Sequence, residues 1–285
     1  MRQHSFEPIV MTTPAPFDTL RWEACFPLLR LNGSGTRDFL HGQTSADLKN
    51  AGDGLIHSCW LNATGRLQAL LEIRLDEKGA DLLVLAGDAS SVATGLDRVI
   101  FPADRVRLSA AGEQRRIQAL RSNGAVIWIG PDETLTADWQ KLQRADERQL
   151  EHWRMLWGWP GSPGELSGDT NPFELGLSPW VSLSKGCYLG QETMAKLASS
   201  GGVKQQLRSW FSDTALVSGD TLTNGEQRAG VVTSVLDIRP GESWIGLALI
   251  RRQHLHADRL SGPQGQQLTL QTPLGFEAPP QPAST

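Results

Sequence analysis

The chain has 285 residues and a formal net charge of −4. It is long enough for one large domain or for two to three modest ones. The mild negative charge gives no sign of the broad basic field of nucleic-acid-binding proteins, so we expect no stable nucleic-acid partner. No stretch approaches the roughly 18 to 20 consecutive apolar residues of a membrane span, so we expect no membrane partner.

The N-terminal residues and the cysteines both bear on the compartment. Residues 1–16 lack the uninterrupted apolar core of a signal peptide, because Glu7 and several prolines break up the short apolar run. The three cysteines, Cys25, Cys59 and Cys187, are widely separated and odd in number, which argues against a disulfide framework and against a cysteine-based metal site. We therefore expect a cytoplasmic protein in a reducing environment.

After a lead-in over residues 1–16 that we expect to be mobile, the first half of the chain predicts strands alternating with short helices. The turn residues Asn62 to Gly65 suit a hairpin. The expected strands are Cys25 to Leu31, Leu55 to Leu61, Leu67 to Leu75, Asp81 to Leu85 and Arg105 to Leu108, and the expected helices are Gly35 to His41, Ser45 to Lys49 and Ala89 to Ile100, with Ser34, Thr44 and Asp88 as caps. This order indicates an α+β architecture, with helices covering one face of a mostly antiparallel sheet.

The middle of the chain predicts two strands, a long helix and a loop. The strands, Arg116 to Leu120 and Ala125 to Ile129, precede the longest expected helix, which begins at a cap at Thr136 and ends at Trp157. Apolar residues interleaved with charges suit an amphipathic helix that lies on a sheet. The stretch from Gly158 to Pro179 is rich in Gly, Pro, Ser and Asn and is therefore a loop. A loop of that length inside a compact chain is more often functional than idle.

A different pattern begins near residue 204, where we place a domain boundary. Short strands separated by turns predict a small β-barrel over residues 204–275. The expected strands are Leu207 to Phe211, Val231 to Ile238, Trp244 to Arg251 and Gln267 to Gln271. His254 and His256 have no third ligand nearby, so we expect no metal site. The proline-containing tail over residues 276–285 is expected to be disordered.

The segment from Lys185 to Glu192 reads Lys-Gly-Cys-Tyr-Leu-Gly-Gln-Glu. Gly186 and Gly190 allow sharp turns on both sides of Cys187. A helix that begins near Gly190 or the next residue would point its unpaired N–H groups toward Cys187 and, with Lys185 beside it, would favour the thiolate. We therefore take Cys187 as the candidate reactive residue.

The remaining cysteines and the nearby cations each have a simpler interpretation. Cys25 and Cys59 read as small buried apolar residues. Four cations lie within a short span around the motif, and they are either solvated or attract an anionic small molecule; these are Lys185, Lys196, Lys204 and Arg208.

Residues 185–192 resemble the signature of the YgfZ-type folate-binding proteins, which are relatives of the aminomethyltransferase (T-protein) of the glycine cleavage system. The resemblance covers most of the chain, and the C-terminal strands are similar to the barrel domain of that family. The further similar segments are Phe39 to Leu48, Arg98 to Val106, Arg154 to Pro160 and Pro172 to Leu177.

The resemblance implies a ring-like, three-lobed arrangement in which two interleaved lobes over residues 17–203 bind folate and the barrel covers residues 204–275. It implies tetrahydrofolate, or a one-carbon derivative, as the cofactor, with Cys187 facing it. Such family members support the synthesis or repair of iron–sulfur proteins, including enzymes that modify tRNA. Iron–sulfur enzymes or assembly factors are therefore the implied partners of what we expect to be a monomer. The residues that carry over as motif neighbours or folate contacts are Lys185, Gly186, Tyr188, Gly190, Gln191, Glu192, Lys196 and Lys204.

The chain also departs from the aminomethyltransferases. They place a catalytic Asp on the strand after the first hairpin turn, where the segment from Gly65 to Leu71 holds no acid before Glu72. They also hold the pterin with a glutamate at the position where Leu156 stands. Two positions at which the family usually has arginine read Lys196 and Gln205.

These departures favour an accessory protein over an enzyme. The alternative is a folate-dependent one-carbon transferase that uses Cys187 or another group in place of the missing Asp. A structural adaptor that has lost folate is a third possibility, because of Leu156.

Overall fold

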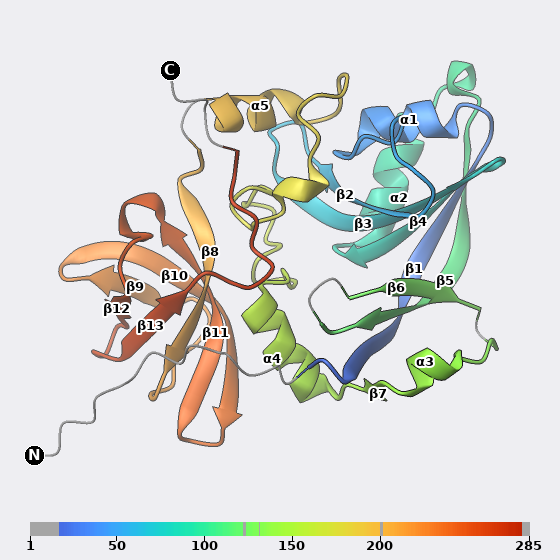
Figure 1. Ribbon diagram of the computed structural model, residues 1–285. Coiled ribbons are helices and arrows are strands. Elements are labelled where there is room, and N and C mark those ends of the chain that lie inside the picture. Colours follow the sequence, from blue (N-terminus) through green and yellow to red (C-terminus); the bar gives the residue numbers. More distant parts are fainter. Residues whose placement is uncertain (1–16, 122–123, 131, 200–201, 281–285) are drawn as a thin grey trace, which may run out of the picture. The chain divides into compact units, whose positions relative to one another are not determined.

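The computed structural model describes residues 17–121, 124–130, 132–199 and 202–280 (Figure 1). The chain divides into two compact units. The smaller unit combines residues 17–25 with 114–153, and the larger unit combines residues 26–113 with 154–280. Two long strands, β1 (Leu20–Asn32) and β5 (Arg107–Ala119), contribute residues to both units.

The larger unit contains the predicted hairpin and a sheet built around it. The strand order is β2-β3-β4-β1, and every pair is antiparallel. The elements are β2 (Leu55–Leu61), β3 (Leu67–Asp76), β4 (Gly79–Ala86), α1 (Thr36–Gln43), α2 (Ala89–Asp97) and the short helix η1 (Pro102–Asp104). Leucines of the strands pack with Phe39 and Leu40 of α1 and with Leu96 of α2, so both helices bury their apolar faces in one core. Asp88 caps α2 as predicted, accepting the N–H groups of Ser90 and Ser91.

The C-terminal part of the larger unit is a closed barrel with the strand order β10-β11-β8-β13-β12-β9. Its strands are β8 (Gln205–Ser212), β9 (Thr221–Asn224), β10 (Gln227–Arg239), β11 (Ser243–Arg251), β12 (Arg259–Ser261) and β13 (Gln267–Gln271), and η3 (Arg252–His254) follows β11. Trp210 lies fully buried in its core and donates to the carbonyl of Leu247 at 3.2 Å. A Cβ at Gly246 would lie 2.5 Å from the Trp210 ring, so this glycine makes room for the indole. The predicted barrel is therefore confirmed, although the two shortest strands, β9 and β12, were not predicted.

The prediction of one long helix from Thr136 to Trp157 is wrong. The segment from Thr136 to Trp157 holds two helices, α3 (Ala137–Gln140) and α4 (Glu147–Trp157), with the two-residue strand β7 (Gln143–Arg144) between them. The N–H of Gln143 donates to the carbonyl of Thr19, so the backbone pairs with β1 instead of continuing the helix. The strand β6 (Val126–Ile129) pairs with β5 as expected.

Three smaller expectations also change. The strands expected at Arg105 to Leu108 and at Arg116 to Leu120 are parts of the single strand β5. The helix expected at Ser45 to Lys49 is absent from this described segment, because the N–H of Ser45 bonds to the carbonyl of Cys59 on β2. The N-cap residue of α1 is Gly35 and not the expected Ser34, and no side-chain hydrogen bond caps this helix.

One residue of the expected disordered tail, Glu277, pairs with the segment at residues 176–177, which corrects the start of that tail. The N–H of Glu277 donates to the carbonyl of Gly176 at 3.0 Å, and Leu177 and Glu277 form a parallel bridge. The expected mobile lead-in over residues 1–16 and the last five residues, 281–285, lie outside the described residues.

The α+β class, the mostly antiparallel sheets and the C-terminal barrel are confirmed, whereas the ring-like arrangement stays a prediction. Among the described residues, no helix is both long and apolar enough to cross a membrane.

Candidate functional site

The motif loop runs from Lys185 into the helix α5 (Gln191–Ser199), which begins where the sequence predicts. Gly190 has a φ of +84°, and a Cβ at this position would lie 2.8 Å from the carbonyl oxygen of Asn62 in the hairpin turn. A side chain would therefore meet both an unfavourable backbone conformation and a close contact. Gly186 has open space around it instead. Gly190 is thus the glycine that lets the loop pack on the hairpin.

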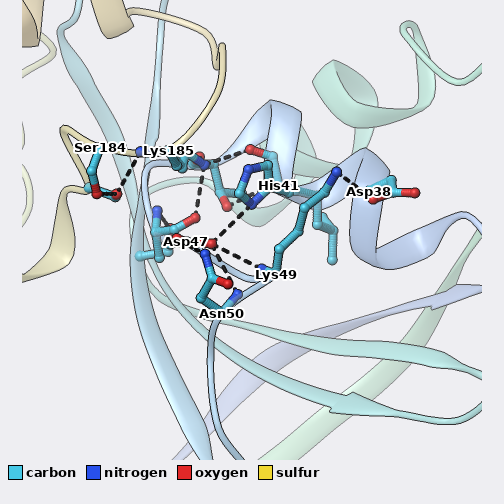
Figure 2. Close-up of polar contacts among 12 residues, drawn as sticks. Asp38, His41, Asp47, Lys49, Asn50, Ser184 and Lys185 are labelled. Carbon is cyan, nitrogen blue, oxygen red and sulfur yellow. Dashed lines mark hydrogen bonds and ion pairs between the residues drawn. The ribbon is translucent and has the colours of Figure 1, made fainter.

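The ammonium group of Lys185 is buried and bonds to three backbone carbonyls (Figure 2). They belong to His41 and Thr44 at the end of α1 and to Ala46, whose oxygen accepts at 2.8 Å. We call these three oxygens the ammonium site. A protonated lysine has three N–H donors, which matches three acceptors. Lys185 therefore fastens the motif loop to the segment after α1, and its charge faces these oxygens instead of a ligand. Burial lowers the pKa of Lys185 to about 8, and the charge of Asp47 partly offsets this effect.

Two further motif side chains support the loop from inside. The Tyr188 ring lies under the ammonium group of Lys185, with 4.5 Å between Nζ and the ring centroid. Burial raises the pKa of Tyr188, and its hydroxyl has no hydrogen-bond partner among the described residues. Gln191 Nε2 donates to the carbonyl of Lys185 at 3.2 Å. These motif neighbours hold the loop in place around an exposed Cys187.

Cys187 lines a cavity of about 540 Å3, which we call the thiol cavity. Its lining residues are Asp38, His41, Gly42, Asp47, Lys49, Asn50, Ser184, Lys185, Gly186 and Cys187. Figure 2 shows its polar side chains, with Asp47 between His41 and Asn50, and Lys49 directed toward Asp38. The cavity therefore combines a thiol, an imidazole, two carboxylates and two amines.

Asp47 is a fixed carboxylate beside His41. Its Oδ1 accepts the N–H groups of Lys49 and Asn50, and its Oδ2 accepts Asn50 Nδ2 at 2.8 Å. These bonds lower the pKa of Asp47. Its Oδ1 lies 3.5 Å from His41 Nδ1, which is buried and has no hydrogen-bond partner in the described part of the chain. Burial, followed by the charge of Lys185, lowers the pKa of His41, which favours its neutral imidazole.

A second cavity, of about 840 Å3, lies beside the hairpin turn and the start of the barrel, and we call it the cationic cavity. Its lining residues are Arg66, Asp169, Glu174, Gly202, Val203, Lys204, Gln205, Arg251, Arg252 and Gln253. The Glu174 carboxyl is almost fully buried, and burial raises its pKa although the N–H of Asn171 and the charge of Arg66 act in the opposite direction. The cavity is therefore lined by four cationic side chains and two carboxyl groups.

An aromatic cluster not predicted from the sequence lies elsewhere in the larger unit. The rings of His57 and Trp180 stack, with centroids 4.5 Å apart and planes 12° apart, and Trp159 packs edge-on against Trp180. His57 Nε2 lies 2.9 Å from Oε1 of Glu72, a carboxyl group with no exposed surface. Trp180 here belongs to η2 (Ser178–Trp180). The adjoining cavity measures only about 80 Å3, which is too small for a folate.

The predicted site residues lie in three different places: the thiol cavity, the cationic cavity and the exposed surface of α5. Lys185, Gly186 and Cys187 line the thiol cavity, and Lys204 lines the cationic cavity. Glu192 and Lys196 are exposed on α5.

Arg208 and Cys25 differ from what the sequence predicts. Arg208 is buried, where its guanidinium donates to the carbonyl of Leu207 and lies over the ring of Phe276, so it is a structural cation. Cys59 is buried as expected, but Cys25 is exposed, because it occupies an outward position on β1.

The sequence analysis missed His41, Asp47, Arg66 and Glu174 as site residues. His41 and Asp47 lie in the segment from Phe39 to Leu48, and the polar residues of that segment could have indicated a second part of the site. In the part of the chain that the structure describes, no three His, Cys, Asp or Glu side chains are grouped closely enough to hold a metal ion.

Comparison with known proteins gives a fold and one distant relative. No family model matches the chain. A chloroplastic protein of Arabidopsis thaliana, provisionally named as a transferase, is 25% identical over 276 residues, and the match covers 80% of this chain and 64% of that protein. The chain thus spans less than two thirds of that relative's length.

The crystal structure of glycine cleavage system aminomethyltransferase T from Bartonella henselae superposes with a TM-score of 0.71 at 16% sequence identity. The superposition covers 92% of this chain and 88% of that chain. The two proteins therefore have the same fold, and this chain has the fold of a glycine-cleavage aminomethyltransferase.

Proposed function

We propose that the protein binds tetrahydrofolate, or a one-carbon derivative of it, and supports the synthesis or repair of iron–sulfur proteins through Cys187. The observation that carries the proposal is the motif loop, in which Lys185 and Gly190 fix the backbone around an exposed thiol on an aminomethyltransferase fold. A loop that is held this firmly while its cysteine stays accessible suits a thiol that acts on a partner.

The residues of the cationic cavity fit a folate. Its volume of about 840 Å3 lies within the range of cavities that hold ligands of this size. A pterin presents an amino group and a ring N–H. A carboxylate such as Glu174 or Asp169 would accept hydrogen bonds from these donors. The acidic glutamate tail would meet Lys204, Arg251 and Arg252. Bound tetrahydrofolate supplies a carrier for one-carbon units.

The iron–sulfur role rests on the accessibility of Cys187. One cysteine cannot supply the four thiolates usual for a cluster, so any contact with a cluster is shared with a partner or transient. An exposed thiol at the rim of a cavity meets that requirement, because a partner can approach it from solvent. We therefore propose iron–sulfur enzymes or assembly factors as partners.

The test is an anaerobic calorimetric titration with tetrahydrofolate of the wild-type protein and of Cys187→Ala, together with iron–sulfur enzyme activities in a strain that lacks the gene. We expect both proteins to bind one equivalent with similar affinity, because Cys187 and Glu174 line different cavities. We expect only the wild-type gene to restore the enzyme activities. Full restoration by Cys187→Ala would refute the role of the thiol, and absence of binding to the wild-type protein would refute the folate.

A one-carbon transferase is the second candidate, and the pair of the buried Glu72 with the partly exposed His57 favours it. The strand β3 lacks an acid before Glu72, yet Glu72 is held against an imidazole that is about one-third exposed. Such a pair could serve as acid and base in place of the missing Asp. Turnover of methylene-tetrahydrofolate with an acceptor, lost in Glu72→Gln and kept in Cys187→Ala, would favour this candidate over the accessory role.

A further inference from the structure

We propose that Cys187, His41 and Asp47 act as a nucleophile, its proton acceptor and an orienting carboxylate, so that the thiol cavity carries out covalent chemistry on a small polar electrophile. This inference goes beyond the proposed function, which requires the thiol but gives it no base and no site for a small molecule. It stands on the arrangement of side chains around the cavity and does not depend on folate.

The geometry gives the first argument. His41 and Cys187 come from α1 and from the motif loop, 146 positions apart, yet both line the same cavity of about 540 Å3. His41 is about nine-tenths buried, and its Nδ1 has no hydrogen-bond partner among the residues described. Asp47 Oδ1 lies 3.5 Å from this Nδ1, so a carboxylate stands beside one nitrogen of an imidazole that lines the cavity. The Lys185 ammonium site joins the two segments that carry these side chains, so their shared cavity is built by the fold.

The charges around His41 give the second argument. Four charged groups face the imidazole: Asp38, Asp47, Lys49 and Lys185. Lys49 is paired with Asp38 at 2.8 Å and Lys185 is bonded to carbonyls, whereas Asp47 Oδ1 lies 3.5 Å from Nδ1 of the ring. A carboxylate beside Nδ1 favours the tautomer that carries its proton there, and Nε2 is then the proton acceptor. The lowered pKa of His41 favours the neutral imidazole, the form that a base needs before it takes a proton.

The proposed step balances as a simple displacement. The Cys187 thiol passes its proton to Nε2 of His41 while sulfur forms a bond to the electrophilic atom of the substrate. The bond to the leaving group breaks, and that group departs with the electron pair. The imidazolium, which Asp47 stabilises, then returns its proton to solvent. No external oxidant or reductant takes part.

The experiment measures alkylation of the full-length, ligand-free protein by iodoacetamide, with peptide mass spectrometry to follow each cysteine. Cys25 is an exposed thiol outside the thiol cavity and serves as the internal reference in the same tube. The variants are His41→Gln and Asp47→Asn, and His152→Gln is the matched control, because His152 lies in the smaller unit. Thermal unfolding of each variant checks that the fold is retained.

We expect Cys187 in the wild-type protein to react at least about tenfold faster than Cys25 at neutral pH, a threshold set below the roughly 10²–10⁴-fold effects typical of general acid–base catalysis. The excess of the Cys187 alkylation rate over the Cys25 rate should disappear in His41→Gln and shrink in Asp47→Asn, and it should persist in His152→Gln. In the wild-type protein the excess reactivity of Cys187 should also fade as the pH falls and His41 becomes protonated, at a pH below the ordinary histidine pKa, while Cys25 shows no such step.

Equal rates for Cys187 and Cys25, or an excess that survives in a folded His41→Gln protein, would overturn the proposal. If His41→Gln does not fold, the pH profile of the wild-type protein decides the question, because a purely structural His41 would leave no step in the Cys187 to Cys25 ratio. The readout involves neither folate nor an iron–sulfur protein, so its failure is distinct from failure of the proposed function.

Discussion

The Nζ atom of Lys185 lies 2.8 Å from the carbonyl oxygen of Ala46, which is 139 positions earlier in the chain. This contact fastens the motif loop to the turn that follows α1, and so it sets where Cys187 lies. The sequence alone would suggest that Lys185 binds an anion, but in the structure this lysine holds the motif loop in place. The function of the motif therefore depends on a structural residue as much as on its thiol.

Replacing Lys185 with Met should lower the free energy of unfolding by about 2–4 kcal/mol, because three buried carbonyls lose their charged donor. Urea unfolding measures the loss. The control is Lys49→Met, which removes a surface pair with Asp38 and should cost no more than about 1 kcal/mol. Equal stability of the two variants would mean that the ammonium site contributes nothing.

The stability difference between the wild-type protein and Lys185→Met should depend on pH. Burial lowers the pKa of Lys185 to about 8 in the folded protein, from its ordinary value of 10.5 in the unfolded chain. Between these values the unfolded chain binds more protons at this position than the folded one, so the wild-type protein gains stability with rising pH. The cost of burying the charge is fully present below about pH 8 and is relieved toward pH 10.5. Unfolding titrations of both proteins across this interval should show the difference increasing, and a decreasing difference would contradict the lowered pKa.

Local patterns in the sequence were enough for most of the fold. The hairpin around Asn62 to Gly65 was predictable because its strands have the right length and its turn has the right chemistry. The prediction of a long helix ending at Trp157 was wrong because Gln143 pairs with a strand segment more than a hundred residues away. The prediction of a helix at Ser45 failed because Ser45 bonds to Cys59 on β2 and to Trp180 and Ser182, which lie far along the chain. Helix propensity is a weak prior that such distant contacts override.

The site was predictable only in part. The motif indicated Cys187 and a helix beginning at Gln191, because glycines and a helix start leave local signals. It could not indicate that Lys185 bonds to Ala46 or that His41 shares a cavity with the thiol, because no local pattern encodes a contact across more than a hundred residues. The same holds for Glu174, whose burial depends on packing of the loop against the barrel.

The two glycines of the motif should respond differently to substitution by Ala. Gly190→Ala places a Cβ 2.8 Å from the carbonyl oxygen of Asn62 at a φ of +84°, and we expect a loss of about 1–3 kcal/mol. Gly186→Ala meets nothing within 4 Å and should change stability by no more than about 0.5 kcal/mol. Denaturant unfolding of the pair tests this within one loop. Similar losses for both variants would mean that the loop does not pack on the hairpin through Gly190.

The cations of the cationic cavity should determine how tightly a folate binds. Replacing Lys204 or Arg252 with Met removes a positive charge near the proposed glutamate tail, and each change should weaken tetrahydrofolate binding by roughly threefold to tenfold. The effect should be larger for a folate with several glutamates and smaller at high salt, because these exposed charges are screened. Calorimetry with both ligands measures it, and Lys141→Met is the control, since Lys141 is an exposed residue of the smaller unit that pairs with Asp138. Unchanged affinity in both cavity variants, or an equal loss in Lys141→Met, would place the folate elsewhere on the protein.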